Sequence, residues 1–450
     1  MSGFLLSLFP ATMNLALLLL CIELLTTNAS EQAEATSPAA PFDVIHYDAQ
    51  IEPDIAQKKV AGKVLIKLKA LIDNLATVEL DCGDLTINAV RENSQEQRFV
   101  RTDRRLVVSL ARPAKANEMR ELEVQYHGTP ARGIRFFPEQ EQVYTAFSTS
   151  EWLVCVDAPD GRATLRLNLV LPANLNAVAN GRLEARHTST NNKVMYEWRQ
   201  EMPIPTYTFG FAAGRFRTLA EKRGHVQLRY LAAQFSDEEL RRIFRDTSDA
   251  ISFYEDRSGV RYSDTTYTQV LAAGRIEQEM SGFTVIRESY GRDLLANERD
   301  VWLMAHELAH QWWGNRVTCR DWTHFWLNEG MATFMAAAYK EQRFGREEYV
   351  REIEQYRTRY EKVRDSGKDR SLHFPDWLHP TPEDRALVYQ KGAYVLHLLR
   401  EELGERLFWK GIREYTRKYF GKSVTTADFQ TAMEQATVRT CRSLFPSGYI

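Results

Sequence analysis

Residues 306–310, HELAH, decide how the rest of the chain is interpreted. Two histidines four positions apart on a helix are separated by about one turn, so His306 and His310 leave the same face and can converge on one ion. The surrounding apolar run has capping residues before it and a glycine after it, which predicts a helix from about residue 298 to Gly314. This stretch therefore predicts a metal-binding helix. The alternative is a structural helix with an accidental match.

A lone carboxylate further along the chain completes the set of metal ligands. Glu329 lies in the stretch WLNEG, where Asn328 is expected to cap a second helix that ends at Gly345. Three protein ligands, His306, His310 and Glu329, leave a fourth position for water, which is the arrangement of a catalytic rather than a structural zinc ion.

Length and composition limit the class of protein. A chain of 450 residues is too long for one ordinary core, so two or three domains are expected. The 58 basic residues nearly balance the 60 acidic ones, which gives a net charge of −2 and no support for nucleic-acid binding. The five cysteines are scattered without a CxxC pair, so neither a cysteine metal site nor a disulfide framework is indicated.

The first 41 residues resemble a targeting segment. Leu15 to Leu25 is strongly apolar and is followed by a polar stretch rich in small residues, which is typical of a secretory signal peptide with a linker. Cleavage is expected after Ala29 or Ala35, and an uncleaved membrane anchor is the alternative. The first basic residue is Lys58, so the positive start of a signal peptide is missing. We expect an exported protein (periplasmic, extracellular or membrane-anchored) rather than a cytoplasmic one.

The spacing of apolar residues divides the remaining chain into two expected domains. Residues 42–216 alternate apolar and polar side chains between turn signals, which predicts an antiparallel β domain. Residues 217–450 change to a helical period, with one helix expected over Ser236–Tyr254 and a short buried strand over Tyr267–Ala272. This second domain carries the proposed metal ligands.

The run HELAHQWWGNRVTCRDWTHFWLNEGMATF, residues 306–334, resembles the zinc-site segment of the gluzincin aminopeptidases, peptidase family M1, which includes aminopeptidase N. Members place 18 residues between the second histidine and the glutamate, as here. The resemblance implies an α+β multidomain fold, with the β domain followed by a thermolysin-like, mainly helical domain containing a small mixed sheet. It also implies one Zn2+ per chain and peptide substrates. Relatives commonly continue into further C-terminal domains, so a more open cleft, or loss of a segment, is expected here.

Two further residues receive catalytic roles. Glu307 lies beside a metal ligand and is the expected general base. The stretch VYQKGA, residues 388–393, resembles a family segment whose tyrosine stabilises the oxyanion, so the resemblance assigns that role to Tyr389. Together these residues imply hydrolysis of the N-terminal peptide bond.

A second family segment, GxMEN, carries a glutamate that binds the free α-amine of the substrate, beside the zinc on an edge strand. Residues 276–280 stand there, and among them Glu279 keeps a carboxylate although the rest of the motif is lost. A carboxylate that holds an ammonium group fixes which peptide bond lies over the metal. The alternative is that Glu277 and Glu279 are exposed edge-strand charges. Relatives also carry a glutamine for the amine where this chain has Ala146.

Other departures keep rival functions open. Relatives usually have an acid at the positions of His324 and Ala336, where it would orient the metal ligands. One rival, favoured by the degraded amine-binding motif and the missing C-terminal domains, is a zinc endopeptidase with relaxed recognition of the N-terminus. The other, favoured by the loss of these acids, is a catalytically silent peptide-binding relative. Whether His324 lines a pocket or lies on the surface is left open by the sequence.

Overall fold

The computed structural model describes residues 40–188, 191–373, 377 and 380–437. The predicted targeting segment, residues 1–41, lies almost entirely outside these residues. Among the described residues, no helix is both long and apolar enough to cross a membrane.

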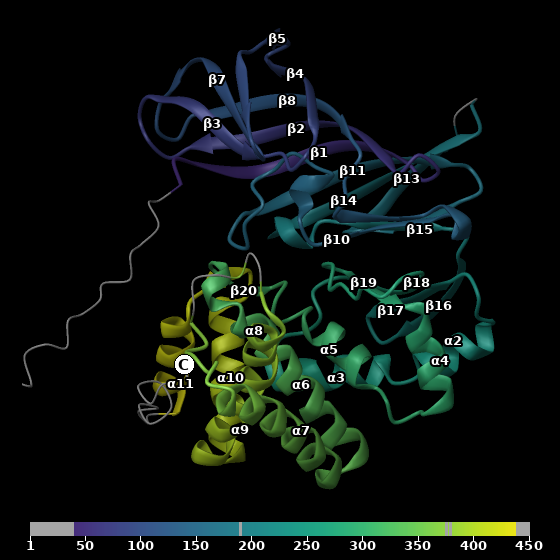
Figure 1. The fold of residues 1–450 in the computed structure, drawn as a ribbon, viewed down its shortest axis with the longest axis vertical. Helices are drawn as coiled ribbons and strands as arrows, with labels where there is room; N and C mark the ends of the chain where they lie inside the picture. The colour runs from purple at the N-terminus through teal and green to yellow at the C-terminus, as the bar shows by residue number, and fades with distance from the viewer. Residues whose placement is uncertain (1–39, 189–190, 374–376, 378–379, 438–450) are drawn as a thin grey trace, which may run out of the picture. The chain divides into compact units, whose positions relative to one another are not determined.

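The first part of the described chain is built from strands, as the period of two predicts. We call strands β1–β15 the β part (Figure 1). In β2 the side chains of Val64, Ile66 and Leu68 are buried and alternate with more exposed neighbours. The strands of the β part are β1 (Phe42–Asp54), β2 (Lys59–Ala70), β3 (Leu75–Asp81), β4 (Thr86–Glu92), β5 (Gln95–Glu96), β6 (Phe99–Thr102), β7 (Arg105–Ala114), β8 (Met119–Gly128), β9 (Gly133–Phe137), β10 (Gln142–Ala146), β11 (Arg162–Pro172), β12 (Asn176–Ala179), β13 (Arg182–Thr188), β14 (Lys193–Pro205) and β15 (Phe211–Gly214).

The largest sheet has eight strands in the order β13-β14-β11-β1-β2-β8-β4-β5. Its pairs are antiparallel as predicted, except that β1 and β11 run parallel. Parallel pairing needs a long connection between the strands, and here the chain from β2 to β10 provides it. Smaller sheets, β3-β7-β6 and β12-β15-β10-β9, complete the β part.

The second part, which we call the helical part, carries a small mixed sheet, β16-β17-β18-β19, as expected. Strand β18 buries both faces: Val270 and Ala272 join the core of the β part, whereas Tyr267 and Leu271 join the core of the helices. The elements of the helical part are β16 (Arg217–Arg223), β17 (Val226–Ala232), α2 (Asp237–Ile243), α3 (Thr247–Ser258), β18 (Thr266–Ala272), β19 (Phe283–Arg287), α4 (Glu288–Ala296), α5 (Trp302–Ala309), β20 (Val317–Cys319), α6 (Trp326–Phe344), α7 (Arg346–Asp365), α8 (Pro382–Ala386), α9 (Gly392–Leu403), α10 (Glu405–Tyr419), β21 (Lys422–Val424) and α11 (Thr426–Thr437).

The helix expected over Ser236–Tyr254 is two helices, α2 and α3. Ser236 does cap the first one, and its side chain and that of Glu239 form a reciprocal capping box. The chain leaves helical geometry at Phe244, whose ring stacks on Tyr230 with a centroid distance of 4.8 Å. Packing against the sheet therefore overrides the local helical period.

Both helices of the HELAH region differ from the prediction at their starts. Helix α5 begins at Trp302 rather than near residue 298 and ends at Ala309, before the predicted Gly314. Helix α6 begins at Trp326, so Asn328 lies inside its first turn and is not the cap. The Asn328 side chain instead accepts a hydrogen bond from the backbone N–H of Cys319, 2.9 Å away. The end of α6 before Gly345 and the place of Glu329 in its first turn are confirmed.

Candidate metal centre

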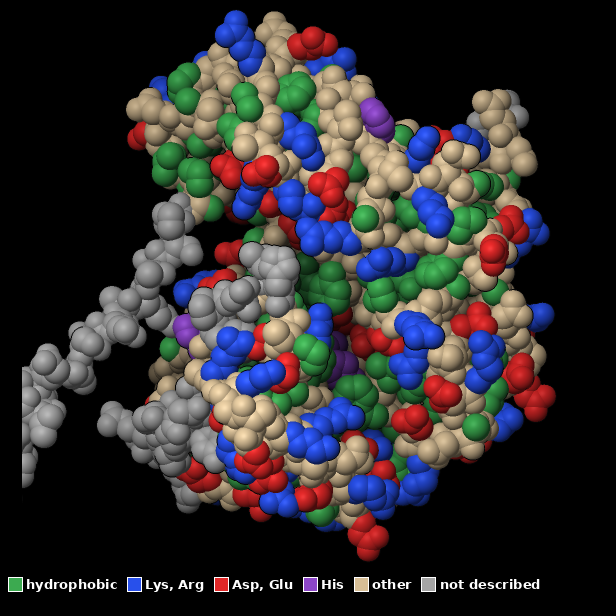
Figure 2. Space-filling model, in the orientation of Figure 1, with side chains coloured by type: hydrophobic (Ala, Val, Ile, Leu, Met, Phe, Trp, Pro, Cys, Tyr) green, Lys and Arg blue, Asp and Glu red, His purple; other side chains and the backbone are tan. Residues whose placement is uncertain are grey.

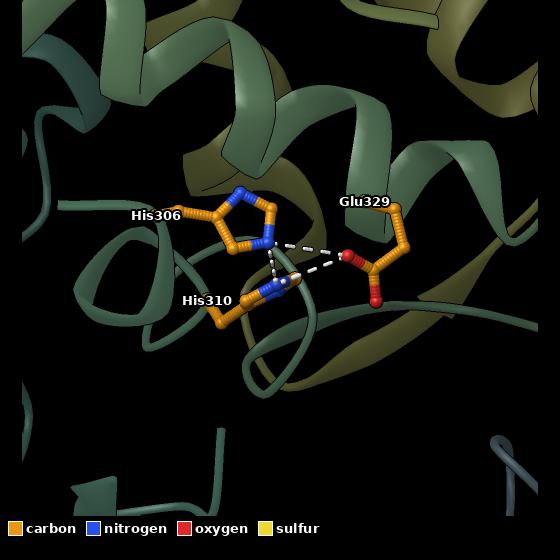
Figure 3. A group of neighbouring side chains, drawn as sticks. All are labelled: His306, His310 and Glu329. Carbon is orange, nitrogen blue, oxygen red and sulfur yellow. Dashed lines mark hydrogen bonds and ion pairs between the residues drawn. The ribbon is translucent and has the colours of Figure 1, made fainter. Parts of the chain in front are cut away.

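Three side chains from α5, its C-terminal end and α6 converge on one point (Figure 3). His306 Nε2 lies 3.1 Å from His310 Nε2, and Glu329 Oε2 lies 3.3 Å from the first nitrogen and 3.4 Å from the second. All three side chains are buried. The HELAH spacing thus brings together the residues that the sequence predicts.

The donor set fits a tetrahedral zinc ion. Zinc bonds of about 2.0–2.1 Å at tetrahedral angles place neighbouring ligand atoms about 3.4 Å apart, close to the three observed separations. Glu329 Oε2 is buried and makes no hydrogen bond, so a cation would supply the partner that it lacks. Among the described residues, no other group of three or more metal-binding side chains is gathered in this way.

The loop after α5 orients the second histidine. His310 Nδ1 lies 3.1 Å from the backbone oxygen of Trp313, which leaves Nε2 free to face the metal position. Gly314 has a φ of +135°, and a Cβ atom there would come within 2.7 Å of His310 Nδ1. Only glycine fits this approach, which explains the residue type at this position.

The first histidine is held from three sides. Its ring stacks between Trp302 and Tyr389, with centroid distances of 4.8 and 5.9 Å. Thr333 Oγ1 lies 3.4 Å from His306 Nδ1. Ala336, where relatives usually carry an acid, is buried on the same helix, so Thr333 is the polar group that this chain places beside the histidine.

Carboxylates outnumber cations around the site. Burial alone would raise the pKa of Glu329, but the imidazoles of His310 and His306 outweigh it and lower that pKa to about 2. Burial likewise opposes protonation of His310, yet Glu329, Glu279 and Glu307 raise its pKa to about 10. The site therefore attracts positive charge, as a divalent cation site must.

The structure brings Glu307, Glu279 and Tyr389 to the same site. Burial raises the pKa of Glu307 well above its usual value, and Glu307 Oε2 has no hydrogen-bond partner. Burial also raises the pKa of Glu279 to about 7, against the pull of His310. Burial, followed by the charges of Glu329, Glu279 and Glu307, raises the pKa of Tyr389 well above its usual value, so its hydroxyl keeps the proton.

The surroundings of Glu279 differ from the family pattern. Residues 276–280 form no strand beyond a single bridge between Gln278 and Val285. Glu279 is buried rather than exposed, whereas Glu277 is paired with Arg287. The interpretation of both residues as exposed edge-strand charges is therefore wrong.

His324 is buried and does not join the metal cluster, so a surface position is excluded. Its Nδ1 accepts a hydrogen bond from the backbone N–H of Thr426, 3.2 Å away, at the start of α11. His324 thus connects the segment before α6 to a helix near the end of the described chain. Ala146, at the end of β10, is also buried.

Some residues around the site were missed by sequence reasoning. Thr333 follows Glu329 by four positions, so the helical period that paired the two histidines could have found it. Tyr207 could not have been found, because it comes from the β part. Its hydroxyl donates to the backbone oxygen of Gly314, 3.0 Å away, and accepts from Asn328 Nδ2, 3.1 Å away.

The fold and the site together are those of a two-domain zinc metallopeptidase. The M1 zinc metallopeptidase from Deinococcus radiodurans is similar in structure, with a TM-score of 0.74 and 25% identity; the match covers 88% of this chain and 90% of that one. The chain also matches the model of the Peptidase M1 N-terminal domain over residues 44–208 and that of the Peptidase family M1 domain over residues 244–447. It belongs to peptidase family M1, and the family and the donor set support zinc as its cofactor.

Curated relatives from yeast to bacteria carry aminopeptidase names. The chain is 24% identical to Aminopeptidase 2, mitochondrial, of Saccharomyces cerevisiae, over 89% of this chain and 45% of that one. It is 26% identical to Leucine aminopeptidase 2 of Aspergillus oryzae (86% and 66%) and to Aminopeptidase N of Lactococcus lactis subsp. lactis (87% and 49%). The chain thus spans about half to two thirds of the length of these three relatives.

Proposed function

We propose that the protein is a zinc aminopeptidase that releases N-terminal residues from peptides, with His306, His310 and Glu329 as the three zinc ligands. One observation carries the proposal: a buried acid, Glu279, accompanies a ligand cluster whose three donor atoms have tetrahedral spacing. The names of the curated relatives support the same reaction.

Glu307 is the general base of the proposed reaction. Zinc bound to the triad supplies Lewis-acid chemistry: it polarises a peptide carbonyl and lowers the pKa of a water molecule toward about 7. Glu307 Oε2 has no partner within the protein, so it is available to take the proton of the attacking water. The same oxygen then delivers that proton to the leaving amine.

Tyr389 and Glu279 orient the substrate. The protonated Tyr389 hydroxyl donates a hydrogen bond to the oxyanion, and loss of such a donor typically costs about 10² to 10³ in rate. Glu279 binds the α-ammonium group and so sets the first peptide bond against Glu307. This register is what makes the proposed enzyme an exopeptidase. Figure 2 shows a recess in this face of the molecule, where hydrophobic side chains lie beside histidine and charged ones.

Replacing Glu307 tests the mechanism. Glu307→Gln removes the base but leaves the three ligands, so hydrolysis of an aminoacyl amide should fall below detection while about one zinc ion per chain remains bound. Turnover measured together with metal content separates the two effects. Retained turnover would refute the assignment of the base.

The two rivals predict different behaviour. A zinc endopeptidase would cleave an N-acetylated peptide as fast as the free one, because it makes no use of the amine. A silent relative would bind a peptide with zinc present and never cleave it. The proposed aminopeptidase cleaves the free peptide and spares the acetylated one.

Export remains a prediction from residues 1–41. If the segment is a signal peptide, N-terminal sequencing of the mature protein should begin after Ala29 or Ala35. A mature protein found in the cytoplasm with its first residues intact would contradict export.

A further inference from the structure

A chain of side-chain contacts runs from helix α7 to the first metal ligand. Trp302 is the first residue of α5 and lies four positions before His306, so both rings leave the same face of the helix. The two rings stack with a centroid distance of 4.8 Å and an interplanar angle of 17°. The indole Nε1 of Trp302 donates a hydrogen bond to the hydroxyl of Tyr356 in α7, 2.6 Å away. One face of the imidazole is therefore connected to α7 through a single indole.

The same tyrosine hydroxyl also reaches the second support of His306. It donates a hydrogen bond to the backbone oxygen of Thr333 in α6, 3.3 Å away, and Thr333 Oγ1 lies 3.4 Å from His306 Nδ1. A hydroxyl has one donor and two acceptor positions, so Tyr356 can make both bonds at once. Burial raises the pKa of Tyr356 well above its usual value, so the hydroxyl keeps the proton that it donates. One buried oxygen atom thus contacts both residues that adjoin the histidine ring.

The position of Trp302 explains why its indole needs this partner. Trp302 lies in the first turn of α5, and Val301, the residue before it, makes no side-chain capping bond. The indole is only half-buried, whereas Tyr356 is 3% exposed. A half-buried side chain at a helix end changes rotamer readily unless a specific contact fixes it. The Tyr356 hydroxyl supplies that contact.

We propose that Tyr356 is a positioning residue for the zinc centre: its hydroxyl fixes Trp302 and Thr333, and these two residues fix the ring plane of His306. The assignment rests on His306 as a zinc ligand, which belongs to the proposed function, but not on the reaction that follows. Groups that orient a metal-binding histidine from outside the ligand set typically change metal affinity about 10- to 100-fold. Here the orientation of a ligand on α5 is set by a residue of α7.

Removal of one oxygen atom tests the proposal. Tyr356→Phe keeps the ring but loses both hydrogen bonds, so zinc affinity, measured by competition with a chromophoric chelator, should fall about tenfold. The visible absorption band of the cobalt-substituted protein should change too, because the geometry at His306 changes. Tyr349→Phe is the matched control, since Tyr349 is also a buried tyrosine of α7 but its hydroxyl contacts His397 Nδ1 at 2.9 Å. It should leave both readouts unchanged even where it lowers thermal stability.

A second substitution tests the path through the indole. Trp302→Phe keeps an aromatic face against His306 but removes the Nε1 donor, so it should also weaken zinc binding. Adding Tyr356→Phe to this variant should then weaken binding by clearly less than tenfold, because the bond between the two residues is already gone. A full tenfold loss in the Trp302→Phe background would overturn the path through Trp302.

The outcomes separate this inference from the ligand assignment on which it rests. His306→Ala should abolish tight zinc binding; if it binds zinc as tightly as the parent protein, both the ligand assignment and this inference fall. If His306→Ala loses zinc but Tyr356→Phe keeps the parent affinity, or Tyr349→Phe weakens binding equally, only the role of Tyr356 is overturned. If Tyr356→Phe does not fold, Trp302→Phe decides: weaker zinc binding supports the proposal and unchanged binding overturns it.

Discussion

At the scale of single residues, Thr333 is the polar partner of the first histidine of the metal centre. Histidine ligands of metals almost always use their second ring nitrogen to contact an acceptor, which fixes the orientation of the ring. Here His306 Nδ1 has only the hydroxyl of Thr333 at 3.4 Å, because Ala336 carries no polar atom. A neutral hydroxyl is a weaker partner than a carboxylate. The orientation of His306 therefore depends on one modest contact and on its stacking against Trp302 and Tyr389.

Removing that hydroxyl should weaken zinc binding. Thr333→Val keeps the shape of the side chain but leaves His306 Nδ1 without its partner, so zinc affinity should fall about tenfold. Competition with a chromophoric chelator measures the change. Thr333→Ser should restore the affinity, and Thr247→Val, which removes a buried hydroxyl that bonds Gln269, should leave it unchanged. Equal affinity in Thr333→Val and the parent would show that stacking alone orients the ring.

Single residues were predictable where a fixed spacing linked them. His306, His310 and Glu307 follow from a local motif on one helix, and Glu329 follows from its place in the first turn of the next. The hydrogen bond from Gln278 to Glu279 could not be predicted, because no sequence pattern records which side-chain atoms of neighbouring residues meet.

A π-helical turn, Leu387–Lys391, carries Tyr389 at the element scale. Such turns are rare and occur often at functional sites. Lys391 is fully buried and donates to Asp369 Oδ1 at 2.9 Å and to the backbone oxygen of Arg370 at 2.6 Å. Lys391, the last residue of the turn, thus fixes the turn to the segment that precedes α8.

Breaking this anchor should displace Tyr389 without disturbing the metal. Lys391→Met leaves Asp369 without this ion pair and frees the turn, so kcat should fall about tenfold or more while KM and zinc content hold. In a Tyr389→Phe background the same change should cost much less, because the hydroxyl is already gone. Lys368→Met, which removes an exposed pair with Glu383, is the matched control. If Lys391→Met lowers kcat by the same factor in the Tyr389→Phe background, Lys391 does not act through the Tyr389 hydroxyl.

The limits of elements were harder to predict than their existence. The helical period predicted both α5 and α6, but the prediction that Asn328 caps α6 was wrong, because α6 begins at Trp326. Asn328 is a good cap by type, yet its side chain bonds Cys319 and Tyr207, which lie outside the helix. A local rule fails where tertiary contacts claim the same polar atoms.

At the scale of the whole molecule, the β part helps to hold the metal loop. The Tyr207 hydroxyl joins Gly314 and Asn328, the neighbours of the histidine loop and of Glu329. Arg162 donates to Thr318 Oγ1 at 2.8 Å and to the backbone oxygen of Asn315 at 3.1 Å. The metal centre therefore depends on residues about one hundred and more positions away in the sequence.

Loss of the Tyr207 hydroxyl should affect both stability and metal binding. Tyr207→Phe leaves Asn328 Nδ2 without its acceptor, which should lower the free energy of unfolding by about 1–3 kcal/mol. Because Asn328 adjoins Glu329, zinc affinity should fall as well. Tyr196→Phe removes a comparable bond to the Leu175 backbone oxygen inside the β part and should cost stability alone. Thermal unfolding and zinc titration of both variants distinguish the two cases, and identical zinc affinities would contradict the coupling.

At this scale, the features that could not be predicted from the sequence are contacts between segments that lie far apart along the chain. Period and turn signals predicted a β part followed by a helical part, and the family resemblance implied the small mixed sheet; both are found. The parallel pairing of β1 with β11 and the bonds from Tyr207 and Arg162 join segments that no local pattern relates. Such pairings depend on how the whole chain folds back on itself.

The most direct test is mass spectrometry of one unblocked peptide incubated with the zinc-loaded protein. The account predicts stepwise loss of single residues from the N-terminus, which stops when a chelator removes the metal and resumes when zinc is returned. Internal cleavage, or N-terminal trimming that continues at full rate without metal, would contradict it.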